Sequence, residues 1–78
     1  MNNNAIANKI DRIARVGIRN CSEQLNRVGV PAEVADCLNR AILCFSHAME
    51  VQEIARKDVY LATASKWLIE SKKYVRRA

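Results

Sequence analysis

Residues 31–56 read PAEVADCLNRAILCFSHAMEVQEIAR, and this stretch decides the fold because it holds the longest uninterrupted helical pattern in the chain. At 100° per residue, most of its apolar side chains fall on one broad face of a helix. These residues are Val34, Cys37, Leu38, Ala41, Ile42, Phe45, Ala48, Met49 and Ala55. A face this wide predicts a helix that packs against two neighbours rather than one.

A second, narrow apolar ridge is predicted on the opposite side of the same helix. Leu43 and Ile54 lie close together there in projection, with Val51 at the edge. Apolar surface outside the main face is typical of interaction sites. The three ridge residues, together with the nearby Arg40 and His47, are therefore candidate residues of a protein interface.

The preceding segment predicts a helix over residues 5–28, with Asn4 as an acceptable N-cap. Its apolar seam steps by four or three residues. The members of the seam are Ile6, Ile10, Ile13, Gly17, Cys21, Leu25 and Val28. A glycine in a helix interior costs about 1 kcal/mol relative to alanine. Gly17 therefore indicates either the close approach of a neighbouring segment or a kink.

Two boundaries separate three expected helices. Gly29 suits a left-handed conformation after the first helix, and Pro31 suits the first turn of the second. The polar residues 56–58 predict the second break, and the apolar face shifts there. Because no glycine or proline enforces a break, one long helix over residues 31–76 is the alternative. We expect one all-α domain over residues 1–78, with an antiparallel hairpin of helices 5–28 and 31–56 and a third helix at 59–76, assembled as a helical-bundle oligomer. The apolar face of the third helix holds Tyr60, Leu61, Ala64, Trp67, Leu68, Ser71, Tyr74 and Val75.

The net charge of +5 is concentrated at the two ends of the chain. Residues 1–30 carry five basic and two acidic groups, residues 31–57 three and four, and residues 58–78 five and two. Candidate phosphate-binding residues are Arg12, Arg15 and Arg19 in the first helix and Lys72, Lys73, Arg76 and Arg77 at the C-terminal end. The competing interpretation is a solvated helix face on which Glu23 pairs with Arg19 and Arg27. Base-specific reading is not expected, because the third helix has no Asn, Gln or Arg before Arg76.

Several classes of site are not supported by the composition. The chain has one histidine, no Cys-x-x-Cys pair and only two glycines, so neither a metal site nor a phosphate-binding loop is expected, and no cofactor. No run of 18 apolar residues predicts a membrane span. The three cysteines, Cys21, Cys37 and Cys44, indicate buried thiols in a reducing cytoplasm.

One pair of residues suggests a different function. Arg40 and His47 are separated by six residues on one helix face, and this spacing resembles the short motif of the HEPN-type ribonucleases, which are all-helical. The resemblance covers these two residues only. It implies proton transfer by His47 at a ribose 2′-hydroxyl and phosphate contacts from Arg40.

The sequence favours a small non-enzymatic regulator that binds a protein partner and self-associates. In size and character the chain looks like small phage or plasmid antirepressors and inhibitors, although no motif carries that likeness. The alternatives are a small basic nucleic-acid-binding protein and the ribonuclease. A membrane partner is not expected.

Overall fold

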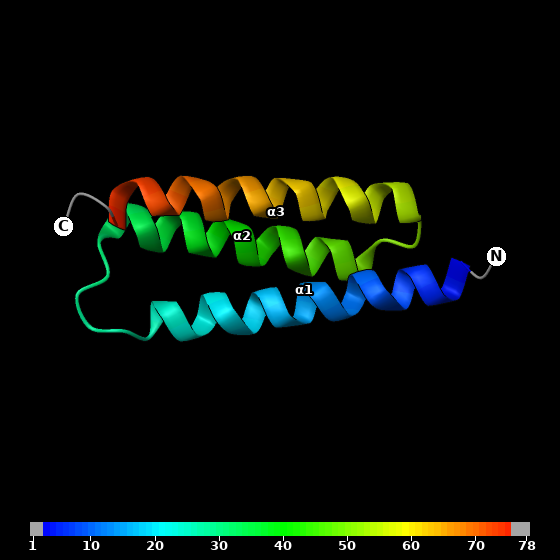
Figure 1. The fold of residues 1–78 in the computed structure, drawn as a ribbon, viewed down its shortest axis with the longest axis horizontal. Helices are drawn as coiled ribbons and strands as arrows, with labels where there is room; N and C mark the ends of the chain where they lie inside the picture. The colour runs from blue at the N-terminus through cyan, green and yellow to red at the C-terminus, as the bar shows by residue number, and fades with distance from the viewer. Residues whose placement is uncertain (1–2, 76–78) are drawn as a thin grey trace.

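Three α-helices lie side by side in a rod of 46 × 18 × 16 Å. The computed structural model describes the backbone of residues 3–75 and the side chains of residues 3–74. The helices are α1 (Asn3–Leu25), α2 (Ala32–Glu50) and α3 (Ile54–Val75). α2 runs antiparallel to both neighbours, so that α1 and α3 are parallel to each other (Figure 1). The expected all-α, three-helix fold is confirmed, and the described residues contain no strand.

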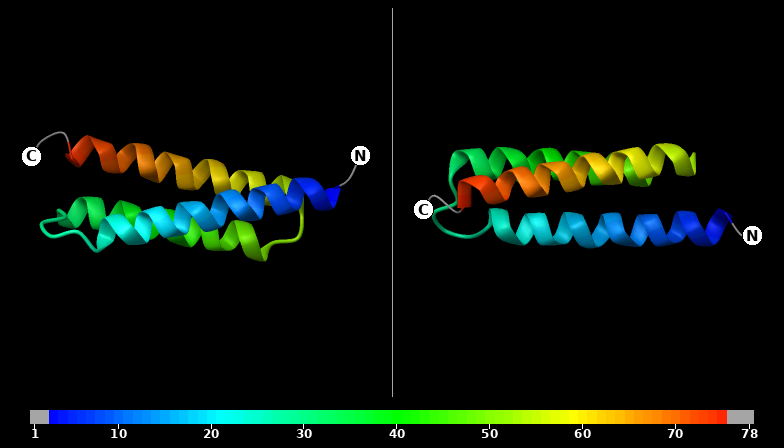
Figure 2. Two further views of the ribbon diagram at one scale, coloured as in Figure 1. Left: turned by 60° about the horizontal axis from the view of Figure 1, so that its bottom comes forward. Right: turned by 45° about the horizontal axis from the view of Figure 1, so that its top comes forward.

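α2 is the central helix, as its wide apolar face predicted. It packs extensively against both α1 and α3, which touch each other much less (Figure 2). Its buried side chains are Val34, Cys37, Leu38, Ala41, Phe45 and Ala48. Ile42, Cys44 and Met49 pack against this core while remaining partly exposed.

The seam of α1 is rotated relative to the prediction. Ile10 and Cys21 are buried as expected, but Ala14 takes a core position that the sequence analysis gave to Ile13, which is exposed. The reason lies at Gly17, where a methyl group on the α-carbon would stand only 2.5 Å from the Phe45 ring. Because this aromatic ring occupies the space beside Gly17, small residues face α2 and the larger Ile13 faces outward. α1 continues through Gly17 as one helix, so the close-approach interpretation is confirmed.

The first connection ends α1 earlier than predicted, at Leu25 rather than residue 28. The amides of Asn26 and Arg27 donate to the carbonyls of Glu23 and Gln24, which tightens the last turn. Gly29 has a φ of 81°, the left-handed conformation that glycine adopts without strain. Pro31 is the N-cap of α2, and its carbonyl accepts a hydrogen bond from Ala35.

The second connection lies at residues 51–53, so the predicted break at 56–58 is wrong. Val51 is extended, with φ −73° and ψ 149°, and α3 begins at Ile54. Lys57, expected in a solvated break, is instead a buried residue of α3.

The apolar face predicted for the third helix is confirmed. Ala64 and Ser71 are buried, and the Ser71 hydroxyl donates to the carbonyl of Leu68 at 2.7 Å. The larger side chains pack against the core from partly exposed positions. They are Tyr60, Leu61, Trp67, Leu68 and Tyr74, and the Val75 side chain lies outside the described residues.

Candidate functional site

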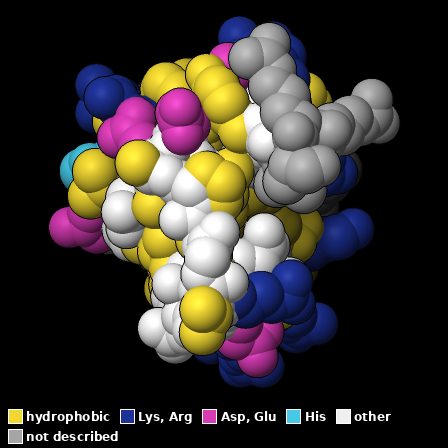
Figure 3. All heavy atoms as spheres, turned by 90° about the vertical axis from the view of Figure 1, so that its left-hand side faces the viewer, with side chains coloured by type: hydrophobic (Ala, Val, Ile, Leu, Met, Phe, Trp, Pro, Cys, Tyr) yellow, Lys and Arg dark blue, Asp and Glu magenta, His cyan; other side chains and the backbone are white. Residues whose placement is uncertain are grey.

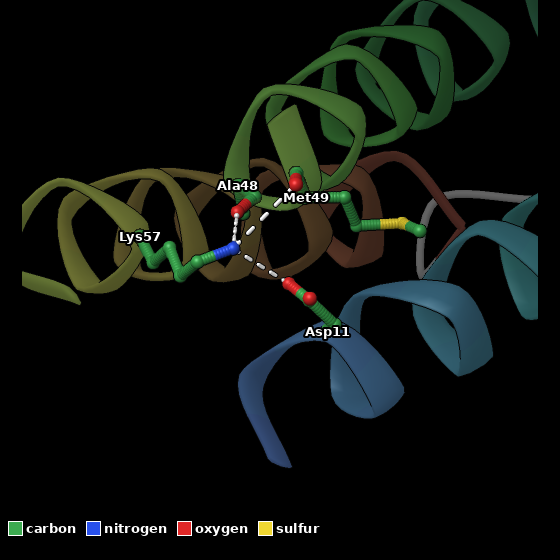
Figure 4. Close-up of polar contacts among 4 residues, drawn as sticks. All are labelled: Asp11, Ala48, Met49 and Lys57. Atoms are coloured by element: carbon green, nitrogen blue, oxygen red, sulfur yellow. Dashed lines mark hydrogen bonds and ion pairs between the residues drawn. The ribbon is translucent and has the colours of Figure 1, made fainter. Parts of the chain in front are cut away.

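A buried lysine joins the three helices at one end of the bundle (Figure 4). Lys57 of α3 is 4% exposed, and its Nζ lies 2.7 Å from Oδ1 of Asp11 in α1. The same ammonium group donates to the carbonyl of Ala48 at 2.9 Å and approaches that of Met49 at 3.5 Å. Both carbonyls belong to the last turn of α2, where the helix dipole favours a cation. We call these contacts the Lys57 clasp.

The sequence analysis missed the Lys57 clasp, although one signal was available. Asp11 lies between Ile10 and Ala14, two buried residues of α1, so a helical projection places its carboxylate beside the core. A carboxylate in that position needs a cation or other donors. The ammonium group of Lys57 contacts three oxygen atoms, one from α1 and two from α2. The clasp therefore connects the three helices structurally.

The predicted ridge on the second helix does not exist as one surface. α2 ends at Glu50, so Val51 lies in the connection and Ile54 is the first residue of α3. Leu43 is 60% exposed on the outer face of α2, about two turns before the end of the helix. The ridge interpretation is therefore wrong in its geometry, and only Leu43 projects as predicted.

Arg40 and His47 both lie where α2 meets α3. The Arg40 guanidinium sits 4.9 Å from the centroid of the Trp67 ring and forms a 3.0 Å ion pair with Asp36. His47 stacks on Tyr60, with ring centroids 5.3 Å apart, and its Nδ1 lies 3.4 Å from Glu50. Each of these side chains thus contacts an aromatic residue of α3 and a neighbouring carboxylate of α2.

The basic residues of α1 form a face without ion pairs. Lys9, Arg12, Arg15 and Arg19 of α1 and Arg27 of the following connection are all exposed, and none pairs with a carboxylate of the described residues. The expected local pairing with Glu23 does not form. In the end-on view, Lys and Arg side chains gather at the lower right, on the α1 side of the molecule (Figure 3). We call these five residues the α1 basic face.

The other predicted phosphate-binding residues differ in their surroundings. Lys72 is exposed on α3. Lys73 forms a 3.0 Å ion pair with Glu70, and this hydrogen bond raises the pKa of the lysine. Arg76 and Arg77 lie outside the described residues.

Apolar side chains stand beside the α1 basic face. Ile13 and Val16 are each 47% exposed, and Ile6 is also exposed. Ile6 and Ile13 belong to the predicted seam and are exposed because α1 is rotated, whereas Val16 lies outside that seam. Arginines next to exposed aliphatic residues are a composition found in protein interfaces, where arginine is enriched and the centre is apolar.

A groove of about 480 Å³ separates α1 from α3. Its lining residues are Gly17, Asn20, Cys21 and Gln24 of α1 with Leu68, Ser71 and Lys72 of α3. The groove arises because these two helices meet α2 but barely meet each other. It is mainly apolar, with one cation, Lys72, at its edge.

The three cysteines are free thiols. Burial raises the pKa of Cys21, Cys37 and Cys44, so the protonated form is favoured in the folded protein. For Cys37, the charges of Glu70 and Asp36 raise the pKa further, against a lowering by Arg40. Such thiols are poor nucleophiles and poor metal ligands near neutral pH.

Comparison with known proteins gives no relative. No protein-family model, curated protein or solved structure matches the chain. Within the described residues, no three His, Cys, Asp or Glu side chains are grouped to hold a metal ion. No helix in this part of the chain combines the length and apolarity that a membrane span requires.

Proposed function

We propose that this chain is a small regulatory protein that acts by binding a protein partner through the outer side of α1. The observation that carries the proposal is the joint exposure of Ile13 and Val16 beside arginines that have no ion pair. Exposed aliphatic residues gain free energy when a partner covers them. The unpaired arginines supply electrostatic attraction to an acidic surface and hydrogen bonds to carboxylates.

Leu43 is a weaker candidate for the centre of an interface than the outer side of α1. It is a single exposed leucine, and isolated apolar residues are common on protein surfaces. Its neighbours Asp36, Arg40, His47 and Glu50 are already paired with one another. By its size, the chain resembles small phage or plasmid antirepressors and inhibitors, and its unpaired cations suit an acidic site on a larger protein.

The experiment is affinity capture of the tagged chain from its host cells, with and without nuclease treatment. A protein partner that survives nuclease supports the proposal. Two matched variants, Ile13→Asp and Leu43→Asp, then locate the interface, because each places one charge at an exposed apolar position. We expect Ile13→Asp to weaken capture by roughly tenfold or more, since a buried unpaired charge costs several kcal/mol. The reverse pattern would move the interface to α2.

The unpaired cations of α1 also favour a second candidate function, nonspecific binding of nucleic acid. Arg12, Arg15 and Arg19 have no carboxylate among the described residues to satisfy them. If they bind phosphates, affinity should fall steeply with salt because counterions are released. The triple Arg→Gln variant should then lower the slope of log K against log salt by about one unit per lost contact. Capture of nucleic acid alone, together with that slope, would replace the protein-binding proposal.

A further inference from the structure

We propose that the groove between α1 and α3 receives one amphipathic helix of the partner, with acidic residues along the flanks of that helix. This inference rests on the proposed function and adds the shape and charge of the partner segment. The bound helix would complete a four-helix bundle, of which this chain supplies three members.

The shape of the groove suits a helix. α1 and α3 run parallel, and each packs against α2 while meeting the other much less (Figure 2). The groove is lined by residues of both α1 and α3. Three of the lining residues, Gly17, Cys21 and Ser71, are small, but Cys21 and Ser71 are buried and the Phe45 ring stands beside Gly17. The accessible lining therefore comes mainly from Asn20, Gln24, Leu68 and Lys72. A helix is about 10 Å across, and an apolar face of that width fits against two neighbouring helices.

The apolar surface extends beyond the groove itself. Ile6, Ile13 and Asn20 are spaced by seven residues and therefore lie in one row along α1. Asn20 lines the groove, so Ile6 and Ile13 continue the same edge toward the start of α1. On α3, Leu61 precedes the lining residue Leu68 by seven residues and continues the opposite edge. A partner helix of about four turns would cover both edges.

The positive charge along the edges of the groove favours an acidic partner helix. Lys72 lines the groove on α3, and Lys9 and Arg12 lie in the adjoining rows of α1 without ion pairs. Two acidic residues reduce this charge: Asp58 lies in the Lys72 row, fourteen residues earlier, and Glu23 is exposed next to the lining residue Gln24. The basic character therefore rests on Lys9, Arg12 and Lys72. A second copy of this chain would bring basic edges against basic edges, which like-charge repulsion opposes.

The test is selection from a displayed library of helical peptides against the purified full-length protein. We expect enrichment of peptides with apolar residues at helical spacing and Asp or Glu beside them. Lys72→Glu should weaken a selected peptide by roughly tenfold, because it places like charges together at the groove. Lys66→Glu is the matched control. It makes the same charge change at another exposed position of α3, outside the groove, and should leave binding within about twofold.

Each other outcome overturns the inference. Selection of basic or non-periodic peptides, or of nothing above background, contradicts the charge and shape assigned to the groove. An equal loss of peptide affinity in Lys66→Glu and Lys72→Glu would indicate nonspecific electrostatic attraction.

The remaining outcomes concern the identity of the partner. Self-association that competes with the peptide and disappears in Ile13→Arg would assign the groove to a second copy of this chain. If capture yields a nuclease-resistant partner whose binding ignores Lys72→Glu, the groove inference fails while the proposed function stands. Capture of nucleic acid alone removes the proposed function instead.

Discussion

At the scale of single residues, the buried ammonium group of Lys57 binds oxygen atoms of two other helices. Its side chain is 4% exposed, whereas that of its partner Asp11 is 27% exposed. Taking an ammonium group out of water is costly, and the pair is tolerated because its donors are satisfied. Removing only one member leaves the other charge poorly compensated.

We predict that Lys57→Met destabilises the protein by about 2–4 kcal/mol, toward the low end of the range for breaking buried pairs because Asp11 keeps some water contact. The free energy of unfolding in urea measures this. Lys73→Met is the control, since Lys73 also pairs with a carboxylate but on the surface, and should change stability by less than about 0.5 kcal/mol. Equal effects of the two changes would show that the clasp contributes nothing beyond a surface ion pair.

The thiols predict an alkaline loss of stability. Burial raises the pKa of Cys21, Cys37 and Cys44 above that of the unfolded chain, so the folded state binds more protons once the pH passes about 8.5. Stability is then fully present below that pH and declines as the pH rises toward the folded-state values. Urea titrations between about pH 7 and 9.5 should show the decline. Cys21→Ala combined with Cys37→Ala should flatten it, and an unchanged slope would rule out these thiols as its source.

At the scale of the elements, the contact between α1 and α2 depends on a residue that has no side chain. Gly17→Ala improves helix propensity by about 1 kcal/mol. We nevertheless predict a net loss of about 1–3 kcal/mol, because the new methyl would stand 2.5 Å from the buried Phe45 ring. Thermal unfolding followed by circular dichroism measures the change. Phe45→Leu should cost less in the Gly17→Ala background than alone. Additive costs would mean that the two residues do not compete for space.

The periodicity of the apolar residues was enough to predict the elements, but not where they end. The face of α2 from Val34 to Met49 is local information, and spacing alone predicted it correctly. Ala55, assigned to the same face, is instead an exposed residue of α3. The end of α2 was not predicted, because residues 51–53 contain no glycine or proline that would mark the break. The predicted ridge failed with that boundary. The rotation of α1 could not be predicted from the sequence either, since it depends on the packing of the Phe45 ring against Gly17.

The candidate surfaces were predictable only in part. The basic residues of α1 could be placed on one face from sequence, and the structure adds that no carboxylate of the described residues neutralises them. The groove could not be foreseen, because it results from the unequal packing of α1 and α3 around α2.

At the scale of the whole molecule, exposed apolar residues predict self-association through α3. Val59 and Ile69 are exposed on its outer side, away from the α1 basic face. Sedimentation equilibrium at micromolar concentration should show more than one chain per particle. The association should strengthen with salt, because screening reduces repulsion between chains of net charge +5. Ile69→Asp should shift the particles toward monomer. A monomer at every salt concentration would contradict this prediction.

The Lys57 clasp also has a consequence for the rates of folding and unfolding. Asp11 and Lys57 are 46 positions apart in the chain, so their contact closes a long loop and requires all three helices to be in place. We expect a contact of this kind to form after the transition state, on the descent to the native structure. Lys57→Met should therefore accelerate unfolding while leaving the refolding rate nearly unchanged. We therefore expect this one ammonium group to lengthen the lifetime of the folded bundle, with little effect on how quickly the bundle forms.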